Sequence, residues 1–144
     1  MMDYRFRDCL HKRHLLKIPV DTGLVEKELK GAEYDLGRAR NSLAEKDYKW
    51  GIVQSYYSIF HAIKALVFSK GYREKRHYCL LIAFKALFVD EDVMEDKYLR
   101  IFSEGMDLRE EADYGLIYSK EAAGELIDNA EELLEKAKSI LKSK

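Results

Sequence analysis

The middle of the chain carries polar side chains that recur at helical spacing and so share one face of a helix. They are Gln54, Tyr57, Ser58, His61 and Lys64. A histidine, a phenol and an ammonium group on one face can bind an anion or transfer a proton. Their helix is otherwise apolar, and an unsatisfied buried polar group costs about 1–3 kcal/mol. The stripe therefore predicts either a solvated edge of the fold or a binding groove.

A second candidate lies between Leu108 and Gly115, where an arginine and a carboxylate stand four residues apart. Arg109 and Asp113 face the same way on a helix, and Asp113 falls in the last turn, where the helix dipole disfavours a carboxylate. We therefore predict that a cation holds Asp113. Arg109 is the nearest candidate, and a histidine from another helix is the alternative. An ordinary ion pair at a helix end would explain the spacing equally well.

The third candidate is His77, which follows Lys75 and Arg76 near the start of a predicted helix. Positive side chains together with the free amides of a helix N-terminus can bind a phosphate group. A solvated basic turn is the alternative interpretation. Either way, the sequence concentrates positive charge directly before this histidine.

Metal chemistry is only weakly indicated. Asp8-x-x-His11 and Glu74-x-x-His77 have the carboxylate-to-histidine spacing of di-iron helical bundles, which also need inward-facing glutamates on two further helices. Both pairs lie among basic residues, outside the regular apolar stripes. The sequence has no glycine-rich phosphate loop and no nucleophile elbow. We therefore expect no bound metal and no cofactor.

Helical periodicity predicts the elements that must position these residues. Apolar side chains recur every three or four residues in four stretches, 25–43, 53–67, 94–112 and 123–140. Asp21, Asp47 and Ser119 are the predicted N-caps of three of these helices. The most apolar helix, expected over about 48–70, should form the buried centre. Shorter helices are predicted over 77–89 and within 3–17.

These elements predict an all-α fold, an antiparallel up-and-down four-helix bundle with one or two additional short helices. The 144 residues suit a single domain, with residues 1–20 as a short basic leader helix and 21–144 as the bundle. Only one proline and eight glycines are present, which argues against a sandwich or barrel with its many turns.

Charge and cysteine content narrow the functional classes. The 25 basic and 26 acidic residues give a net charge of −1, so no global polycation drives nucleic-acid binding, although residues 1–20 and 70–85 are locally basic. Cys9 and Cys79 are too few for a disulfide framework and lack metal-ligand spacing, so we expect reduced, inert thiols. No run approaches the roughly 20 apolar residues of a membrane span, and we expect a cytoplasmic protein.

Three segments together resemble the HEPN superfamily, named for nucleotide-binding domains of higher eukaryotes and prokaryotes. The helix Ser55-Tyr-Tyr-Ser-Ile-Phe-His-Ala-Ile-Lys-Ala-Leu66 is similar to its Tyr-Tyr-x-x-Phe-His-Ala-x-x-Ala-Leu helix. Lys75-Arg-His77 resembles its Lys-x-His turn, and Leu108-Arg-x-x-Ala-Asp-Tyr114 its Leu-Arg-x-x-Ala-Asp-Tyr segment. The likeness covers about residues 22–143 and points to the stand-alone, uncharacterised prokaryotic branch.

The resemblance implies a helical bundle that often forms a homodimer and is commonly encoded beside a minimal nucleotidyltransferase, as in a toxin-antitoxin pair. Many such proteins are metal-independent ribonuclease toxins, in which an Arg and a His with four to six residues between them on one helix meet their dimer mates. This sequence departs there, since Tyr114, Gly115 and Leu116 leave no histidine at the required distance after Arg109. Any ribonuclease would need His61 or His77 as its acid or base.

Two functional hypotheses follow, and the missing histidine favours the first. The chain either binds a nucleotide or RNA in a polar groove beside a nucleotidyltransferase partner, or acts as a metal-independent endoribonuclease toxin with Arg109 and His61 as catalytic groups. A purely structural dimerisation module is the third reading. We expect the groove residues to be Tyr57, His61, His77, Arg109, Asp113 and Tyr114. His61 in particular is predicted to line the same cleft as Arg109.

Overall fold

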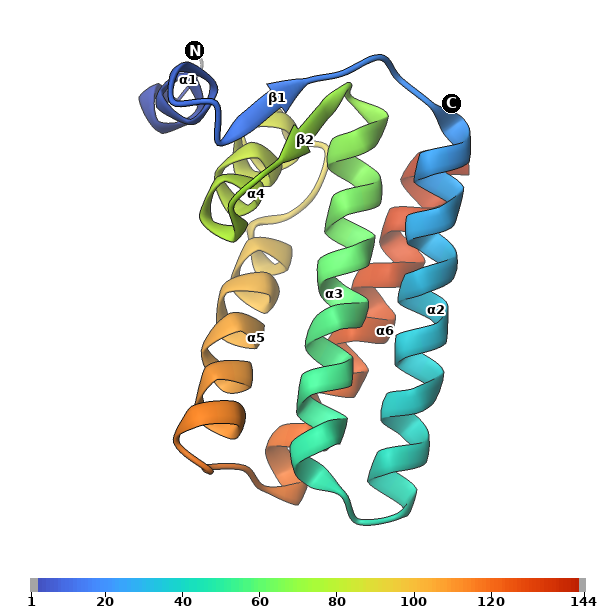
Figure 1. The fold of residues 1–144 in the computed structure, drawn as a ribbon. Coiled ribbons are helices and arrows are strands. Elements are labelled where there is room, and N and C mark those ends of the chain that lie inside the picture. Colours follow the sequence, from blue (N-terminus) through green and yellow to red (C-terminus); the bar gives the residue numbers. More distant parts are fainter. Residues whose placement is uncertain (1–2, 143–144) are drawn as a thin grey trace.

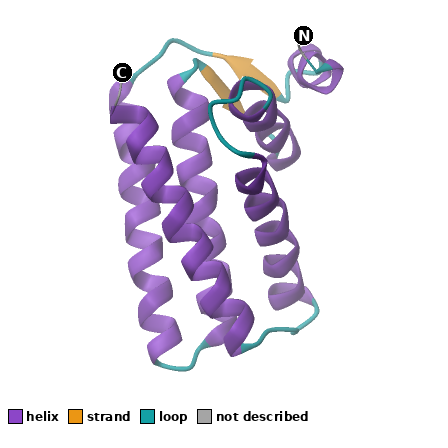
Figure 2. Cartoon of the chain, turned by 180° about the vertical axis from the view of Figure 1, so that it is seen from behind, coloured by secondary structure: helices purple, strands orange, loops and turns teal. Residues whose placement is uncertain are grey.

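A computed structural model describes residues 3–142 as an elongated bundle of helices with a small sheet at one end (Figure 1). The chain order is α1, β1, α2, α3, β2, α4, a π-helical turn, α5 and α6. Four long helices run along the bundle, and the sheet and short helices cluster at the end where both termini lie (Figure 2). No helix within residues 3–142 is long and apolar enough to cross a membrane.

The helices α2 (Thr22–Ala44) and α3 (Tyr48–Ser69) form an antiparallel hairpin that begins and turns at the predicted caps. The Asp21 carboxylate accepts the Gly23 N–H at 2.8 Å, and Asp47 accepts the Trp50 N–H at 3.4 Å. Each cap satisfies one of the amides that a helix start leaves free. Gly71 ends this part of the chain with a positive φ of 82°, a conformation that glycine adopts without strain.

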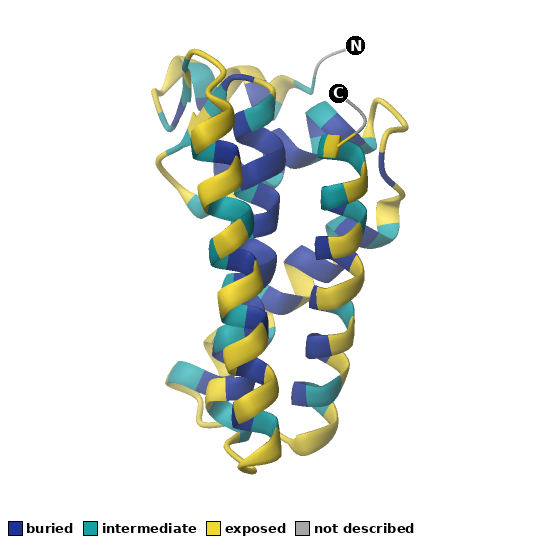
Figure 3. Cartoon of the chain, turned by 90° about the vertical axis from the view of Figure 1, so that its right-hand side faces the viewer, coloured by how far each residue is buried: buried dark blue, intermediate teal, exposed yellow. Residues whose placement is uncertain are grey.

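Helix α3 is the centre of the structure, as its apolar content predicts. It packs against α2, α5 and α6, and most of its residues are buried (Figure 3). Helix α5 spans Asp96–Tyr114, and α6 spans Lys120–Lys142 after Ser119, whose hydroxyl accepts the Ala122 N–H at 3.0 Å. The all-α bundle is therefore confirmed, with its core along α3.

The region predicted as one short helix near the N-terminus contains two elements instead. Helix α1 spans only Tyr4–His11, and strand β1 (Leu15–Lys17) pairs antiparallel with β2 (Tyr72–Glu74). Arg13, with a φ of 60°, makes the turn between them. A three-residue strand has no periodicity that a sequence could reveal, and only its distant partner stabilises it. Residues 1 and 2 of the predicted leader lie outside the described part.

The helix predicted over 77–89 changes type partway along. Helix α4 spans His77–Phe84, and a π-helical turn follows over Lys85–Val89. In Figure 1, α4 and α5 lie one above the other beside α3. This places the start of α4 next to the middle of the bundle, where α3 and α5 pack together.

The expectation of reduced, inert cysteines is wrong in this structure. Cys9 of α1 and Cys79 of α4 form a disulfide, with their Cα atoms 5.9 Å apart and both residues buried. Seventy positions separate them in the sequence, and the pairing of β1 with β2 brings their helices together. The bond ties the N-terminal segment to the rest of the fold.

Candidate anion-binding site

A tyrosine on the buried face of α3 holds the histidine that begins α4. The Tyr56 hydroxyl lies 3.1 Å from Nδ1 of His77, and the Phe60 ring lies 4.5 Å from the imidazole. Burial raises the pKa of Tyr56 to about 12, so the phenol stays protonated and can donate to Nδ1. In that arrangement the neutral imidazole carries its proton on Nε2, where it is a hydrogen-bond donor.

Arg109 of α5 reaches the same tyrosine from the other side. Its guanidinium carbon lies 5.2 Å from the centre of the Tyr56 ring, a cation–π distance. It donates a hydrogen bond to Asp113 at 3.5 Å, the pairing that the sequence predicted. The Nε–H is buried, and within residues 3–142 it has no acceptor. A guanidinium has five N–H donors, so the long hydrogen bond and the unpaired Nε–H leave part of the donor capacity of Arg109 unused.

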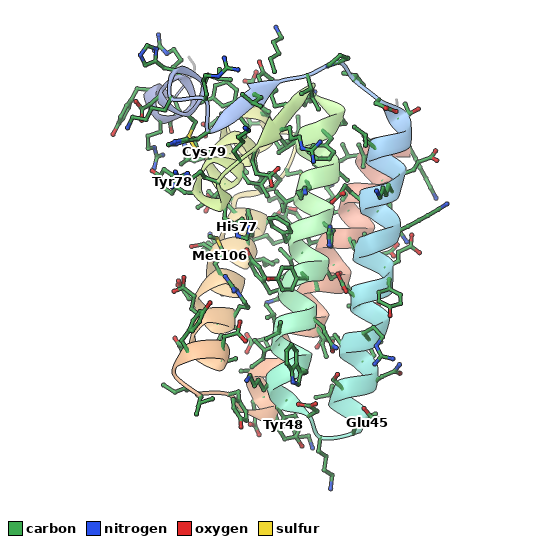
Figure 4. All side chains as sticks on the ribbon, in the orientation of Figure 1. Glu45, Tyr48, His77, Tyr78, Cys79 and Met106 are labelled. Carbon is green, nitrogen blue, oxygen red and sulfur yellow. A yellow bond between two sulfur atoms is a disulfide. The ribbon has the colours of Figure 1, made fainter. Side chains whose placement is uncertain are left out.

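The start of α4 adds further donors beside His77. Arg76 occupies the N-cap position but makes no side-chain hydrogen bond to the helix, so the first amides of α4 are not capped by its side chain. Figure 4 labels His77, Tyr78 and Cys79 along this first turn. The Cys79 N–H already donates to the Arg76 carbonyl at 3.0 Å, so the N–H groups of His77 and Tyr78, the imidazole and the nearby guanidinium of Arg109 are the hydrogen-bond donors here that suit a phosphate.

His61, in contrast, belongs to a separate polar cluster between α3 and α2. Its Nδ1 lies 2.7 Å from Glu28 and its Nε2 lies 3.5 Å from Asp35. Burial raises the pKa of Glu28, but the hydrogen bond from His61 and the charge of Lys64 outweigh this effect and leave it below its ordinary value. Because both ring nitrogens face carboxylates on α2, the expectation that His61 lines a cleft with Arg109 finds no support in these contacts. His77 takes that place.

The other residues of the predicted stripe have different surroundings. Tyr57 is half-buried and packs edge-on against Tyr56, with ring centres 5.3 Å apart. Ser58 is fully buried and donates to the Ala32 carbonyl at 2.8 Å, and Gln54 is hydrogen bonded to Ser42. Tyr114, the last residue of α5, is 80% exposed. The stripe is therefore partly structural, and Tyr57 is the member that packs against Tyr56, the residue that contacts both His77 and Arg109.

Sequence reasoning missed two residues near this site. Tyr56 lies on the apolar stripe, but a buried phenol needs a hydrogen-bond partner, and that requirement is the signal that could have linked it to a histidine. Glu74 of β2 was considered only as a metal ligand. Its Oε2 lies 3.9 Å from Lys64, and within residues 3–142 its buried Oε1 has no hydrogen-bond partner. Burial raises the pKa of Glu74, with the charge of Lys64 opposing it.

A cavity of about 380 Å³ lies elsewhere, between the beginning of α2 and the end of α6. Its walls are mainly apolar and include Val25, Leu29 and Leu141. None of the predicted site residues lines it. We therefore assign the candidate site to the donors around Tyr56 rather than to this cavity.

We predict that an anion binds this site more tightly as the pH falls from about 8 to 6. Burial lowers the pKa of His77 below its ordinary 6.5, and the charges of Arg109 and Lys64 lower it further. Protonating His77 in the free protein therefore costs stability as the pH falls below 6.5, and a bound anion reverses that cost. Sulfate is the suitable probe, because its charge does not change in this range, and calorimetry at several pH values measures the effect.

The variant His77→Gln should lose this pH dependence. His11→Gln is the matched control, since His11 is an exposed histidine on α1. If His77→Gln kept the pH profile of the wild type, His77 would not be the titrating group.

The fold and the site define a class of protein, a small helical bundle with cationic donors gathered beside its central helix. Comparison with known families gives the particular family: the HEPN domain model matches residues 25–140. The chain belongs to the HEPN family. This confirms the resemblance in the three sequence motifs.

Two relatives and one solved structure place the chain more closely. A protein of Methanocaldococcus jannaschii named "Putative toxin MJ0605" is 34% identical over 112 residues, or 77% of this chain and 84% of that one. The "UPF0332 protein" of Archaeoglobus fulgidus is 30% identical over 103 residues, 67% of this chain and 82% of that one. The crystal structure of TT1696 from Thermus thermophilus has a TM-score of 0.64 at 22% identity, covering 80% of this chain and 96% of that one, which shows a shared fold.

Proposed function

We propose that this HEPN domain binds a nucleotide or an RNA through a phosphate group held between α3, α4 and α5. The observation that carries the proposal is the incompletely paired guanidinium of Arg109, which shares Tyr56 with His77. A half-buried cation with unused donors is costly to a fold unless a ligand completes its hydrogen bonds. Phosphate fits these donors in charge and in geometry.

The toxin-like name of the Methanocaldococcus jannaschii relative supports a role in a toxin-antitoxin pair. We infer a partner of the minimal nucleotidyltransferase class, as the family resemblance implies. A nucleotidyltransferase also binds a nucleotide, so a domain that binds a nucleotide phosphate would share its class of ligand. The partner would be detected by co-purification of the two proteins after joint expression.

A second candidate function is metal-independent RNA cleavage, and one contact favours it. Helix α5 lacks the histidine that family ribonucleases carry after the arginine, but His77 comes to Arg109 from α4 through Tyr56. An imidazole can act as acid or base while a guanidinium stabilises the charge of the phosphorane. His77 rather than His61 is the residue we assign to that role.

The proposed function is tested with two probes, ADP and a labelled single-stranded RNA, in buffer containing a metal chelator. Titration calorimetry with ADP measures binding, and gel analysis of the RNA measures cleavage. We expect ADP to bind and the RNA to remain intact. RNA cleavage that His77→Gln abolishes would establish the second function, and the absence of ADP binding would contradict the first.

We also propose that the protein is a homodimer. The apolar faces of α3 and α4 are buried within the chain, so they are not available for a contact with a second copy. The loop between α5 and α6 instead exposes neighbouring apolar side chains, including Leu116 at 67% and Ile117 at 62%. Exposed apolar groups of this kind commonly mark an interface.

In analytical ultracentrifugation at micromolar concentration we expect the mass of a dimer. The double variant Leu116→Ser and Ile117→Ser should shift the protein to a monomer, because it removes the apolar surface available for the contact. Val93→Ser is the control, as Val93 is an exposed apolar residue before α5. A monomeric wild type would refute the dimer, and a dimeric double variant would refute this interface.

A further inference from the structure

The small sheet brings together the two segments of the chain that are locally basic. The Lys75 N–H donates to the His14 carbonyl at 2.7 Å, and the Ile18 N–H donates to the Gly71 carbonyl at 2.8 Å. The disulfide joins Cys9 and Cys79, which are a few residues away in the sequence from His14 and Lys75. Two segments about 60 positions apart in the sequence, each of them rich in cations, therefore lie side by side at this end of the molecule (Figure 1).

Several acidic residues of these two segments are already neutralised. Asp3 lies 2.8 Å from Arg5, and Asp8 lies 3.1 Å from Lys12. Glu74 is turned inward toward Lys64, because successive side chains of a strand point to opposite faces. The carboxylates of these residues are thus already paired with cations within the fold.

Exposed cations remain around the sheet, and four of them lead from the turn before β1 to the start of α4. We call these four the basic face: Arg13, Arg73, Lys75 and Arg76. Within residues 3–142, none of the four forms an ion pair with a carboxylate. Arg13 lies outside residues 25–140 that match the family, whereas Arg73 of β2, Lys75 after it and Arg76, the N-cap of α4, lie within that range. The basic face is therefore formed by the family domain together with the N-terminal segment, which adds the positive charge of Arg13.

The basic face adjoins the candidate site along the chain. Arg76 immediately precedes His77, and Tyr78, the next residue, is 55% exposed (Figure 4). An exposed aromatic ring beside cations is the combination on which unpaired bases stack while their phosphates are neutralised. In a duplex the bases are stacked inside the helix, so none is available to stack on such a ring.

We propose that the basic face binds the backbone of a single-stranded RNA, one phosphate of which occupies the site at His77 and Arg109. This inference rests on the proposed function and extends it, since it names the ligand class and the path of the strand. The strand leaves the site past Arg76, stacks a base on Tyr78, and follows Lys75 and Arg73 toward Arg13. The N-terminal segment is then an RNA-binding extension of the domain.

The test compares two variants with equal loss of charge. The first replaces three cations of the basic face, Arg73→Gln, Lys75→Gln and Arg76→Gln. The control replaces three exposed lysines elsewhere on the helices, Lys27→Gln, Lys30→Gln and Lys120→Gln. Fluorescence anisotropy with a labelled single-stranded RNA of about 12 nucleotides measures affinity at several salt concentrations.

We expect the first variant to bind this RNA at least tenfold more weakly than the control does. The slope of log K against log salt should become shallower by about 2, since each lost phosphate contact on a single strand contributes about 0.7. Arg13→Asn should weaken binding on its own, because it removes a cation. Asparagine tolerates the left-handed backbone of that position, so the turn is kept. Tyr78→Ala should also weaken binding, whereas Tyr78→Phe should not.

The measurements separate this inference from the proposed function, because ADP reaches only the site at His77 and Arg109. If the first variant binds ADP normally but loses RNA, the basic face is the RNA surface. If it binds RNA as tightly as the control, the basic face has no such role, whatever ADP does. RNA binding that depends on the basic face in a protein that does not bind ADP would uphold this surface and refute the phosphate site.

Discussion

In Arg109→Ala we expect the affinity for ADP to fall about 100-fold, the largest effect of any single change in the site. The variant removes the guanidinium that offers a phosphate its best donors, and two charge-assisted hydrogen bonds together contribute about 3 kcal/mol or more. About 1.4 kcal/mol corresponds to a tenfold change in Kd. Titration calorimetry at constant ionic strength measures the difference.

The same helix provides a close control for this variant. Arg100 is also on α5 and also pairs with an aspartate four residues away, Asp96 at 2.7 Å, but it is exposed to solvent. Arg100→Ala should leave ADP binding unchanged. Arg109→Lys should recover only part of the affinity, because an ammonium lacks the planar fork of a guanidinium. Equal affinities in Arg109→Ala and Arg100→Ala would contradict the site.

We expect Cys79→Ala to lower the free energy of unfolding by about 2–5 kcal/mol, the usual cost of losing a native disulfide. The bond closes a long loop, with 70 positions between its cysteines, so its loss frees a large part of the unfolded chain. Urea denaturation followed by circular dichroism measures the change. The affected region is α1 and β1, which the disulfide joins to α4.

A reducing agent gives the control for this prediction. Reduction should destabilise the wild type by a similar amount and leave Cys79→Ala unchanged. If a thiol assay found two free cysteines in the unreduced wild type, or if reduction had no effect on its stability, the disulfide would not contribute as described.

The sequence predicted the long helices because their determinants are local. Apolar residues every three or four positions locate the helices, and Asp21, Asp47 and Ser119 are found as N-caps. The Arg109 and Asp113 pair was equally accessible, since both residues lie on one helix. Information of this kind is contained in windows of a few residues.

The rest depended on contacts between distant segments. The face of α3 that carries His61 borders both α2 and the outer surface. Only the packing shows that Glu28 and Asp35 pair with the two ring nitrogens of His61. The link from His77 to Arg109 passes through Tyr56, a residue that its periodicity assigns to the core. Helical spacing identifies residues on the same side of one helix, but not the neighbour that each side meets.

The pairing of β1 with β2 constrains the order in which the chain can fold. On the ribosome, residues 15–17 emerge before their partners, and strand β2 follows only after all of α2 and α3 has been synthesised. The contacts between α2 and α3 are closer in sequence and can form first, since closing a longer loop costs more entropy. The N-terminus of this protein is thus synthesised first but can reach its final place only once the central hairpin has been made.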